Sequence, residues 1–346
     1  MTEPLAVTAA EAGQKLLQFL ARRVDAPHGE LHRWIRTGQV RINGRRVKAF
    51  DRVHEGDCVR VPPFAAGRQV EERTASGEDT SGLSPAQAAG AVTIVAETND
   101  LLVINKPAGL PTHPGTGHAD SLATRLAAAC PDAPFRPTPA HRLDKDTSGL
   151  LLAAKSYAAL RGLCEAFAAR NGVVKEYLAW VAGQCPWDTP RMLEDRLRKS
   201  ADEDRRTCGR KSYERMHVVP AQDETTDGSG APCRSAKLTA SGVARIDGAS
   251  LLHIRLHTGR THQIRAQLAA HGFPLIGDVK YGGPFAADGL KLHAFRLTVG
   301  ERTWMAPPPW RGVWAVQNIP LLRALETCAP NPPSTIQVIN PPLGDL

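Results

Sequence analysis

A segment near the front of the chain, residues 63–92, divides its 346 residues into two parts, because it holds no pattern from which a helix or a strand could pack. It is rich in Ala, Gly, Ser and Glu, and its apolar residues follow neither a helical nor a strand period. This composition is typical of a flexible linker. We therefore predict two folded domains, at residues 12–62 and 93–320, followed by a C-terminal tail at residues 321–346. The tail is rich in proline after residue 328, and we expect it to be disordered.

The composition excludes several classes of protein. An apolar fraction of 42% and a charged fraction of 23% are those of a folded chain, not of a wholly disordered one. No stretch approaches the roughly 18 consecutive apolar residues of a membrane helix, and the N-terminus lacks the basic and apolar regions of a secretory signal. Seven scattered cysteines without a Cys-x-x-Cys pair favour reduced thiols over a zinc site or disulfides. We expect a cytoplasmic protein without bound metal and without a membrane partner.

The first domain is predicted to contain two helices and a small group of strands. Apolar residues recur at helical spacing in residues 13–24 and 30–38, and Gly38 occupies the position of a helix C-cap. Asn43-Gly44 predicts a tight hairpin between two short strands, and a further short strand follows it.

Positive charge gathers in this first domain. Residues 31–60 hold eight Lys or Arg and three Asp or Glu, a local net charge of +5, whereas the whole chain carries +8. The basic side chains fall mostly on the second predicted helix and on the hairpin. Such a patch is either a solvated surface or a footprint for nucleic acid. The candidate binding residues in this patch are Arg33, Arg36, Arg41 and Lys48.

The second domain is predicted to be an α+β fold, a large mixed and mostly antiparallel sheet with flanking helices. Strands that follow one another directly, with few helices between them, favour this class over a doubly wound sheet. Residues 184–235 are charged and irregular, so we expect part of them to be a surface insertion. Strands are predicted within residues 93–109 (two strands joined at Asn99-Asp100), 149–155, 175–183 (with alternating burial), 236–259 (a hairpin at Asp247-Gly248) and 290–299, and helices at 156–172 and 261–272.

The most unusual segment is a polar loop directly before a buried strand, residues 139–155. His141, Arg142, Asp144 and Asp146 crowd this loop, and loops held by a rigid sheet often carry catalytic groups. A single loop aspartate is, however, more often a turn cap that accepts nearby backbone N–H groups. The loop by itself leaves both interpretations open.

A second polar constellation covers residues 256–283. Arg260 precedes a predicted helix, and His262 and Arg265 lie near one face of it. The helix N-terminus and the arginines would form an electropositive pocket, although a surface helix with solvated arginines gives the same pattern. Tyr177, on an earlier strand, is placed to project toward the polar loop, but a lone tyrosine on a strand is usually part of the packing.

Taken together, these motifs resemble two known families. In the first domain, the glycine that ends the helix, the V-R-I-N-G hairpin at 40–44 and the E-G-D turn at 55–57 resemble the S4-like RNA-binding domain. In the second, HRLDKDTSGLLLAAK, KEYLA, LHTGRTHQIRAQL and GDVKYGG resemble, in this order, the RluA-type pseudouridine synthases, and NKPAGLPTHPG and LHAF fit the same family. With an S4-like domain in front, the chain is most similar to the RluC/RluD-like branch, which modifies large-subunit (23S) ribosomal RNA.

This resemblance implies an isomerase that converts uridine in RNA to pseudouridine with no cofactor and no metal. It assigns the role of nucleophile, or of the base that removes a sugar proton, to Asp144. Arg265 would keep that carboxylate ionised, through a planar two-point contact. Tyr177 would lie against the flipped base and move the proton from its carbon 5, and Leu292 would pack the base from another side.

The resemblance also implies how the RNA is held. Arg142 would fill the space that the flipped uridine leaves, and Lys106 and Arg260 would hold phosphates. The basic patch of the first domain would add a second RNA contact and raise the affinity through tethering.

Other functions compete with this one on the sequence alone. A pseudouridine synthase of transfer RNA and a catalytically silent RNA-binding factor of ribosome assembly would share much of the pattern, although a silent factor would be expected to lack Asp144, Tyr177 or Arg265, and all three are present. A nuclease could use Asp144, Asp146 and His141 with metal ions, and would then lose its activity in EDTA. We favour the synthase, acting as a monomer on ribosomal RNA or a pre-ribosomal particle.

Overall fold

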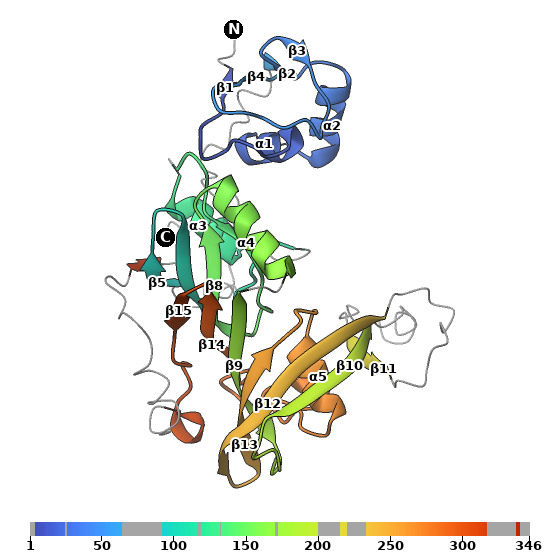
Figure 1. Ribbon diagram of the computed structural model, residues 1–346, viewed down its shortest axis with the longest axis vertical. Coiled ribbons are helices and arrows are strands. Elements are labelled where there is room, and N and C mark those ends of the chain that lie inside the picture. The colour runs from blue at the N-terminus through green and yellow to red at the C-terminus, as the bar shows by residue number, and fades with distance from the viewer. Residues whose placement is uncertain are drawn as a thin grey trace, which may run out of the picture.

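The computed structural model describes residues 4–24, 26–63, 92–115, 119–131, 133–169, 172–199, 215–219, 233–316 and 337–339. The predicted linker lies outside these residues except at its two ends, and so does most of the C-terminal tail. Figure 1 shows a small group of helices and strands at one end of the molecule, and a much larger group built on a long sheet.

The small group packs two helices against a four-stranded sheet of order β1-β4-β2-β3. Its core is apolar and fully buried, with Phe19 and Trp34 as the largest side chains. The predicted hairpin is confirmed, because Asn43 and Gly44 have positive φ angles of 50° and 77° between β2 and β3. The predicted start at residue 12 is too late, since β1 pairs with β4. The elements are β1 (Leu5–Ala6), α1 (Leu16–Arg23), α2 (His28–Arg36), β2 (Arg41–Ile42), β3 (Arg45–Arg46) and β4 (Cys58–Arg60).

The large group is a mixed sheet with helices beside it, which confirms the predicted α+β class. Its main path runs β11-β10-β12-β13-β9-β14-β8-β6-β5-β16, and β15 and β7 pair at its side. The elements are β5 (Val92–Glu97), β6 (Leu101–Lys106), α3 (Leu122–Ala129), β7 (Thr138–Pro139), β8 (Ser148–Ala154), α4 (Tyr157–Ala169), β9 (Val173–Ala182), β10 (Arg191–Lys199), β11 (Met216–Val219), β12 (Arg234–Ile246), β13 (Ala249–Leu256), α5 (Gln263–Ala270), η4 (Val279–Tyr281), β14 (Leu292–Val299), β15 (Arg302–Met305), η5 (Gly312–Trp314) and β16 (Gln337–Ile339).

Three expectations about this group are wrong. Residues 184–235 are not irregular throughout, because they contain two regular strands, β10 and β11, which extend the sheet. The surface insertion predicted for part of this segment stays a prediction, since residues 200–214 and 220–232 lie outside the described part. The side chains of β9 alternate between its two faces, but their burial does not, because one face packs into the core with Ala179 and the other into a second cluster with Trp180. The tail, expected to be disordered, contributes β16, which pairs antiparallel with β5.

The strand β14 joins the two halves of the sheet that carry the polar motifs. It pairs antiparallel with β9 on one side and parallel with β8 on the other. The contact with β8 is very close, since a Cβ atom at Gly149 would lie 2.3 Å from the carbonyl oxygen of Ala294. Gly149 also has a φ of 115°, so only glycine fits there without strain. This pairing places the loop before β8 opposite the residues of β9.

The small group is in contact with the large one. The Arg22 guanidinium donates to the Thr138 hydroxyl (3.0 Å) and lies over the ring of Phe135, 4.3 Å from its centroid. The backbone N–H of Tyr157 donates to the carbonyl oxygen of Ala10 at 2.8 Å. The beginning of α4 and the segment around β7 therefore form the contact surface for the first domain. Within the described ranges, no helix has both the length and the apolar character to cross a lipid bilayer.

Candidate active site

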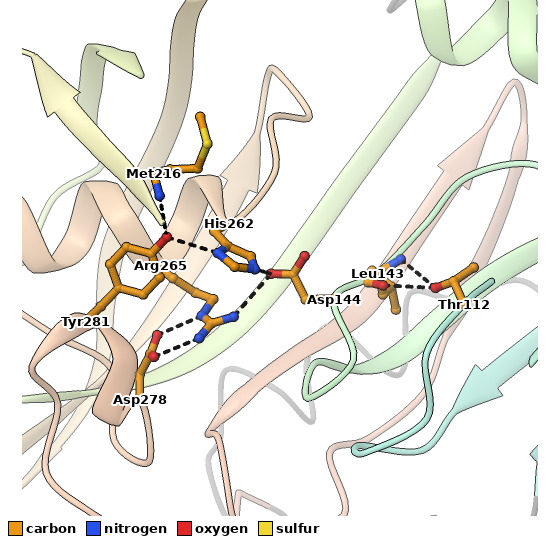
Figure 2. A network of polar contacts seen from close by, with 8 residues as sticks. All are labelled: Thr112, Leu143, Asp144, Met216, His262, Arg265, Asp278 and Tyr281. Atoms are coloured by element: carbon orange, nitrogen blue, oxygen red, sulfur yellow. Dashed lines mark hydrogen bonds and ion pairs between the residues drawn. The ribbon is translucent and has the colours of Figure 1, made fainter. Parts of the chain in front are cut away.

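Asp144 lies on the loop between β7 and β8, and its two chain neighbours are held firmly. The hydroxyl of Thr112 donates to the Leu143 carbonyl oxygen (2.9 Å) and accepts from the Leu143 N–H (3.1 Å), as Figure 2 shows. On the other side, Lys106 Nζ donates to the carbonyl oxygen of Lys145 at 3.0 Å. The backbone at Asp144 is thus fixed from both directions, which suits a group that must meet a substrate in one orientation.

Lys106 is not placed to bind a phosphate, so this expectation is wrong. Its side chain is 0% exposed, and Nζ donates to three carbonyl oxygens, those of Pro107, Leu110 and Lys145. Burial lowers the pKa of Lys106 to about 7, although the charges of Asp146 and Asp144 oppose that shift. The three carbonyl oxygens oppose it as well, because a neutral amine has only two N–H groups. Lys106 therefore shapes the loop of Asp144 from beneath.

We expect Lys106→Met to lower the free energy of unfolding by on the order of 3 kcal/mol, because three buried carbonyl oxygens lose their donor. Turnover should fall at least tenfold, whereas the salt dependence of RNA binding should stay parental, because no phosphate contact is lost. Urea unfolding, single-turnover kinetics and a binding titration measure the three quantities. A reduced salt slope with parental stability would return Lys106 to the phosphate role.

The same variant has a pH signature. The pKa of Lys106 in the folded protein, about 7, lies below its ordinary value of 10.5. Between these values the unfolded chain binds more protons than the folded one, so the stability of the parent rises with pH in this window. The stability of the parent relative to Lys106→Met should therefore increase from pH 7 to pH 10.

The guanidinium of Arg265, on α5, lies between two carboxylates (Figure 2). Nε and Nη2 donate to the two oxygens of Asp278 at 2.8 Å each, and Nη1 is 3.6 Å from Oδ2 of Asp144. The predicted proximity of Arg265 to Asp144 is thus observed. The two-point contact expected for this pair is made with Asp278 instead, which is 2% exposed and needs a fully hydrogen-bonded partner. Burial disfavours the charge of Arg265, but Asp278 outweighs burial and the pKa of Arg265 is raised.

His262 lies directly before α5 and faces Asp144 from the same side as Arg265. Its backbone is in the left-handed region, with a φ of 51°, which histidine tolerates better than most residues. Nε2 is 3.9 Å from Asp144 Oδ2, and Nδ1 is 2.9 Å from the hydroxyl oxygen of Tyr281, which also accepts the Met216 N–H at 3.0 Å (Figure 2). Asp144 thus faces one guanidinium and one imidazole.

Asp144, His262 and Arg265 line a cavity of about 400 Å³, a volume within the range of small-ligand sites. Tyr177 and Leu292 are buried at its wall, and among the described lining residues Asp144 is the one carboxylate. Burial, together with the charge of Asp144, raises the pKa of Tyr177, so the phenol stays protonated at neutral pH. The Tyr177 hydroxyl can therefore accept a proton from a substrate only if it gives up its own proton.

Positive side chains surround the cavity. Arg142 is exposed at its edge, and Arg260 is partly buried, with Nε donating to the Ser235 carbonyl oxygen at 3.0 Å.

The candidate RNA-binding residues of the first domain lie outside the cavity lining, and three of them, Arg33, Arg36 and Lys48, are exposed. Arg41 is partly buried, and it donates to the carbonyl oxygens of Gly38 (3.4 Å) and Gly44 (3.3 Å).

His141 has a structural task. Its Nε2 accepts the backbone N–H of Leu152 at 3.2 Å, and its ring packs on Phe167 with the centroids 4.5 Å apart. Burial lowers its pKa to about 3, so the imidazole is neutral. In the described part of the chain, no group of three His, Cys, Asp or Glu residues is arranged to hold a metal ion.

Sequence reasoning missed three contributors to this site. Asp278 and Tyr281 lie in the motif GDVKYGG, for which the sequence predicted no role of either residue. The signal that could have indicated a role is an acidic and an aromatic residue between glycines, close in sequence to a helix that carries arginine. Thr112 carries no local signal, because its importance arises only from the long-range contact with Leu143.

Comparison with known proteins adds a family assignment. Residues 100–270 match the family model described as RNA pseudouridylate synthase. A ribosomal large subunit pseudouridine synthase C from Yersinia pestis is 34% identical over 280 residues, which cover 80% of this chain and 79% of that protein. A protein of the same name from Escherichia coli strain K12 is 34% identical over 283 residues, with the same coverage of 80% and 79%. The solved structure of human RNA pseudouridylate synthase domain containing 1 matches with a TM-score of 0.52 at 22% identity, over 73% of this chain and 100% of that one, and shares the fold.

Proposed function

Because this chain belongs to the RNA pseudouridylate synthase family, we propose that it isomerises uridines in large-subunit ribosomal RNA, with the carboxylate of Asp144 as the reacting group. The observation that carries the proposal is the position of Asp144, the one carboxylate among the described residues that line the cavity, beside Arg265. The choice of ribosomal RNA rests on the two bacterial relatives, which this chain covers to 79% of their length.

The reaction breaks the bond between N1 of uracil and C1′ of the ribose, turns the base, and joins its carbon 5 to C1′. The proton on carbon 5 is released and N1 takes up a proton, so atoms and charge balance without a redox partner or group donor. Asp144 either attacks C1′ as a nucleophile or removes a sugar proton as a base, and both roles require the ionised carboxylate. The charge of Arg265 favours that ionised form.

The cavity, of about 400 Å³, is proposed to receive a single nucleotide that has left its stack. Extrusion of a base costs a few kcal/mol, which contacts with the protein must offset. We assign the faces of the flipped base to Tyr177 and Leu292, and the vacated space in the RNA to Arg142, which lies at the edge of the cavity two residues before Asp144. Arg260 is assigned to a phosphate, because its guanidinium is oriented by Ser235 at the rim.

The first domain is proposed to bind RNA through Arg33, Arg36, Arg41 and Lys48. Replacing all four with glutamine should raise KM on long RNA several-fold with kcat near parental. The slope of log affinity against log salt should become shallower by about one for each lost phosphate contact. A filter-binding titration checks this, with Lys106→Met as the matched loss of a buried positive charge. An unchanged slope would show that the basic patch faces solvent only.

The substrate is tested directly by mapping pseudouridine in total RNA from a strain that lacks this chain. We expect a modified position to disappear from large-subunit ribosomal RNA and to return when the gene is restored. Loss of a position in transfer RNA would instead name that substrate, and an unchanged map would favour the silent assembly factor. We further propose that the protein works in the cytoplasm as a monomer and without metal, so EDTA should leave its activity intact.

A further inference from the structure

His262 stands beside Asp144, and its ring is fixed from behind by a second hydrogen-bonded group. Figure 2 shows the order of contacts, from the Met216 backbone to the Tyr281 hydroxyl, then to the imidazole and on to Asp144. Met216 lies on β11, Tyr281 on η4, and His262 directly before α5. Residues from separate parts of the chain thus define the position of one imidazole at the wall of the cavity.

The Tyr281 hydroxyl can donate to His262 Nδ1 or accept from it, and the tautomer of the imidazole decides which. The Met216 N–H donates to Tyr281 Oη at 3.0 Å, so the proton of the Tyr281 hydroxyl is available to His262 Nδ1 at 2.9 Å. A neutral imidazole that accepts at Nδ1 carries its proton at Nε2. Nε2 is the nitrogen that faces the carboxylate of Asp144, an acceptor when it is ionised. When the Tyr281 hydroxyl donates to Nδ1, each proton in this group therefore points toward Asp144.

We propose that His262 is a positioning residue for Asp144: as a neutral imidazole oriented by Tyr281, it directs Nε2–H at the carboxylate and, with Arg265, fixes the orientation in which Asp144 reaches the ribose. The inference rests on the proposed role of Asp144. The separation of 3.9 Å exceeds a hydrogen bond by about 1 Å, and such contacts shorten when a substrate closes the site. A neutral donor orients the oxygen lone pairs without a second full positive charge, which would weaken the nucleophile.

The surroundings of the ring support its neutral form. Burial lowers the pKa of His262, and neighbouring positive charges lower it further, against the opposing effect of the carboxylates. The ring of Tyr281 also contacts two guanidinium groups, with centroid distances of 5.1 Å to Arg265 and 5.3 Å to Arg215. The titratable or charged groups that face the imidazole are Arg265 on α5, Lys280 and Tyr281 on η4, Asp278 directly before η4, and Asp144 on its loop.

The protonation state can be read without any RNA. In full-length protein with ¹⁵N-labelled histidine at pH 7, we expect the His262 ring to be neutral with its proton on Nε2, and the signal is assigned by its loss in His262→Gln. In Tyr281→Phe the ring should take up a second proton more readily, so its titration should move toward higher pH. A cationic ring in the parent at pH 7, or a proton on Nδ1, would overturn the proposal.

The kinetic test uses the same variants. Tyr281→Phe should lose activity most strongly at low pH, where the imidazole becomes cationic, so the ratio of kcat at pH 8.5 to kcat at pH 6 should rise about tenfold over the parent, with KM within twofold. In the double variant Tyr281→Phe with His262→Gln, that ratio should return to the parental value, because the glutamine amide still donates but does not titrate.

A purely structural role for Tyr281 would lower kcat equally at every pH and leave the ratio unchanged in both variants, and this result would overturn the proposal. Tyr157→Phe is the matched control, because it removes a hydroxyl at α4 outside the cavity and should keep the parental pH profile. Failure of the proposed function shows itself separately, as a parent protein that forms no pseudouridine in any RNA, while the imidazole is measured in the RNA-free protein.

Discussion

Replacing Asp144 with asparagine is expected to abolish pseudouridine formation while RNA affinity falls by less than tenfold. The amide keeps the size and shape of the side chain, so the loop held by Thr112 and Lys106 should persist. What the variant loses is the charged oxygen, which serves as nucleophile or as base. Release of the carbon 5 proton from labelled RNA, together with a binding titration, measures both quantities.

Asp146→Asn is the matched control for that variant. Asp146 is exposed, two residues away on the same loop, and it is not part of the cavity lining. We expect its replacement to change the rate by no more than a few-fold. Isomerisation by Asp144→Asn at more than one per cent of the parental rate would refute the assignment of the reacting carboxylate.

Arg265→Leu is expected to lose at least 100-fold of the activity at pH 7. Without the guanidinium, Asp144 loses the positive charge that lies 3.6 Å from its Oδ2. The variant also leaves Asp278 buried without its partner, at a cost of about 3–5 kcal/mol. Circular dichroism must therefore show that the variant is folded before its rate is interpreted.

Three companion variants separate the two effects of this arginine. Arg265→Leu combined with Asp278→Asn removes the uncompensated buried charge and should regain stability but not activity at pH 7. Arg265→Lys keeps the charge without the planar contact to Asp278 and should fall between parent and leucine. Tyr177→Phe removes a hydroxyl and leaves the pair of Arg265 and Asp144 in place, so it should lower the rate without lowering stability through Asp278. Parental rates at pH 7 in a folded Arg265→Leu protein would show that this arginine does not assist Asp144.

Local sequence signals predicted the elements whose formation depends on nearby residues. The hairpin at Asn43-Gly44 and the fully buried strand β8 are examples. Strand β10 was missed because Asp195 interrupts its apolar alternation. In the fold this carboxylate faces α5, accepts from Gln267 at 2.7 Å and lies 3.2 Å from His271, so a polar residue is satisfied in a core-facing position. No pattern within β10 itself predicts these partners, because Gln267 and His271 are distant in the sequence.

The sequence predicted which residues form the site better than it predicted which partners those residues contact. The motifs identified Asp144, Tyr177 and Arg265, which the fold brings to one cavity. The burial of Lys106 was not predictable, because a lysine after a strand and before a proline is ordinarily solvated. The two-point contact of Arg265 with Asp278 was also missed, since a sequence does not show which of two carboxylates meets the guanidinium in its plane.

The position of β14 also sets the time at which the protein can first act. Asp144 precedes β8, whereas Tyr177 lies on β9, and these strands have no neighbour in common until β14 pairs with both. Because β14 ends at Val299, a growing polypeptide at about 5–20 residues per second waits several seconds after β9 is made before the two halves can meet. The nascent chain is therefore expected to be inert toward the RNA around it until β14 has been made.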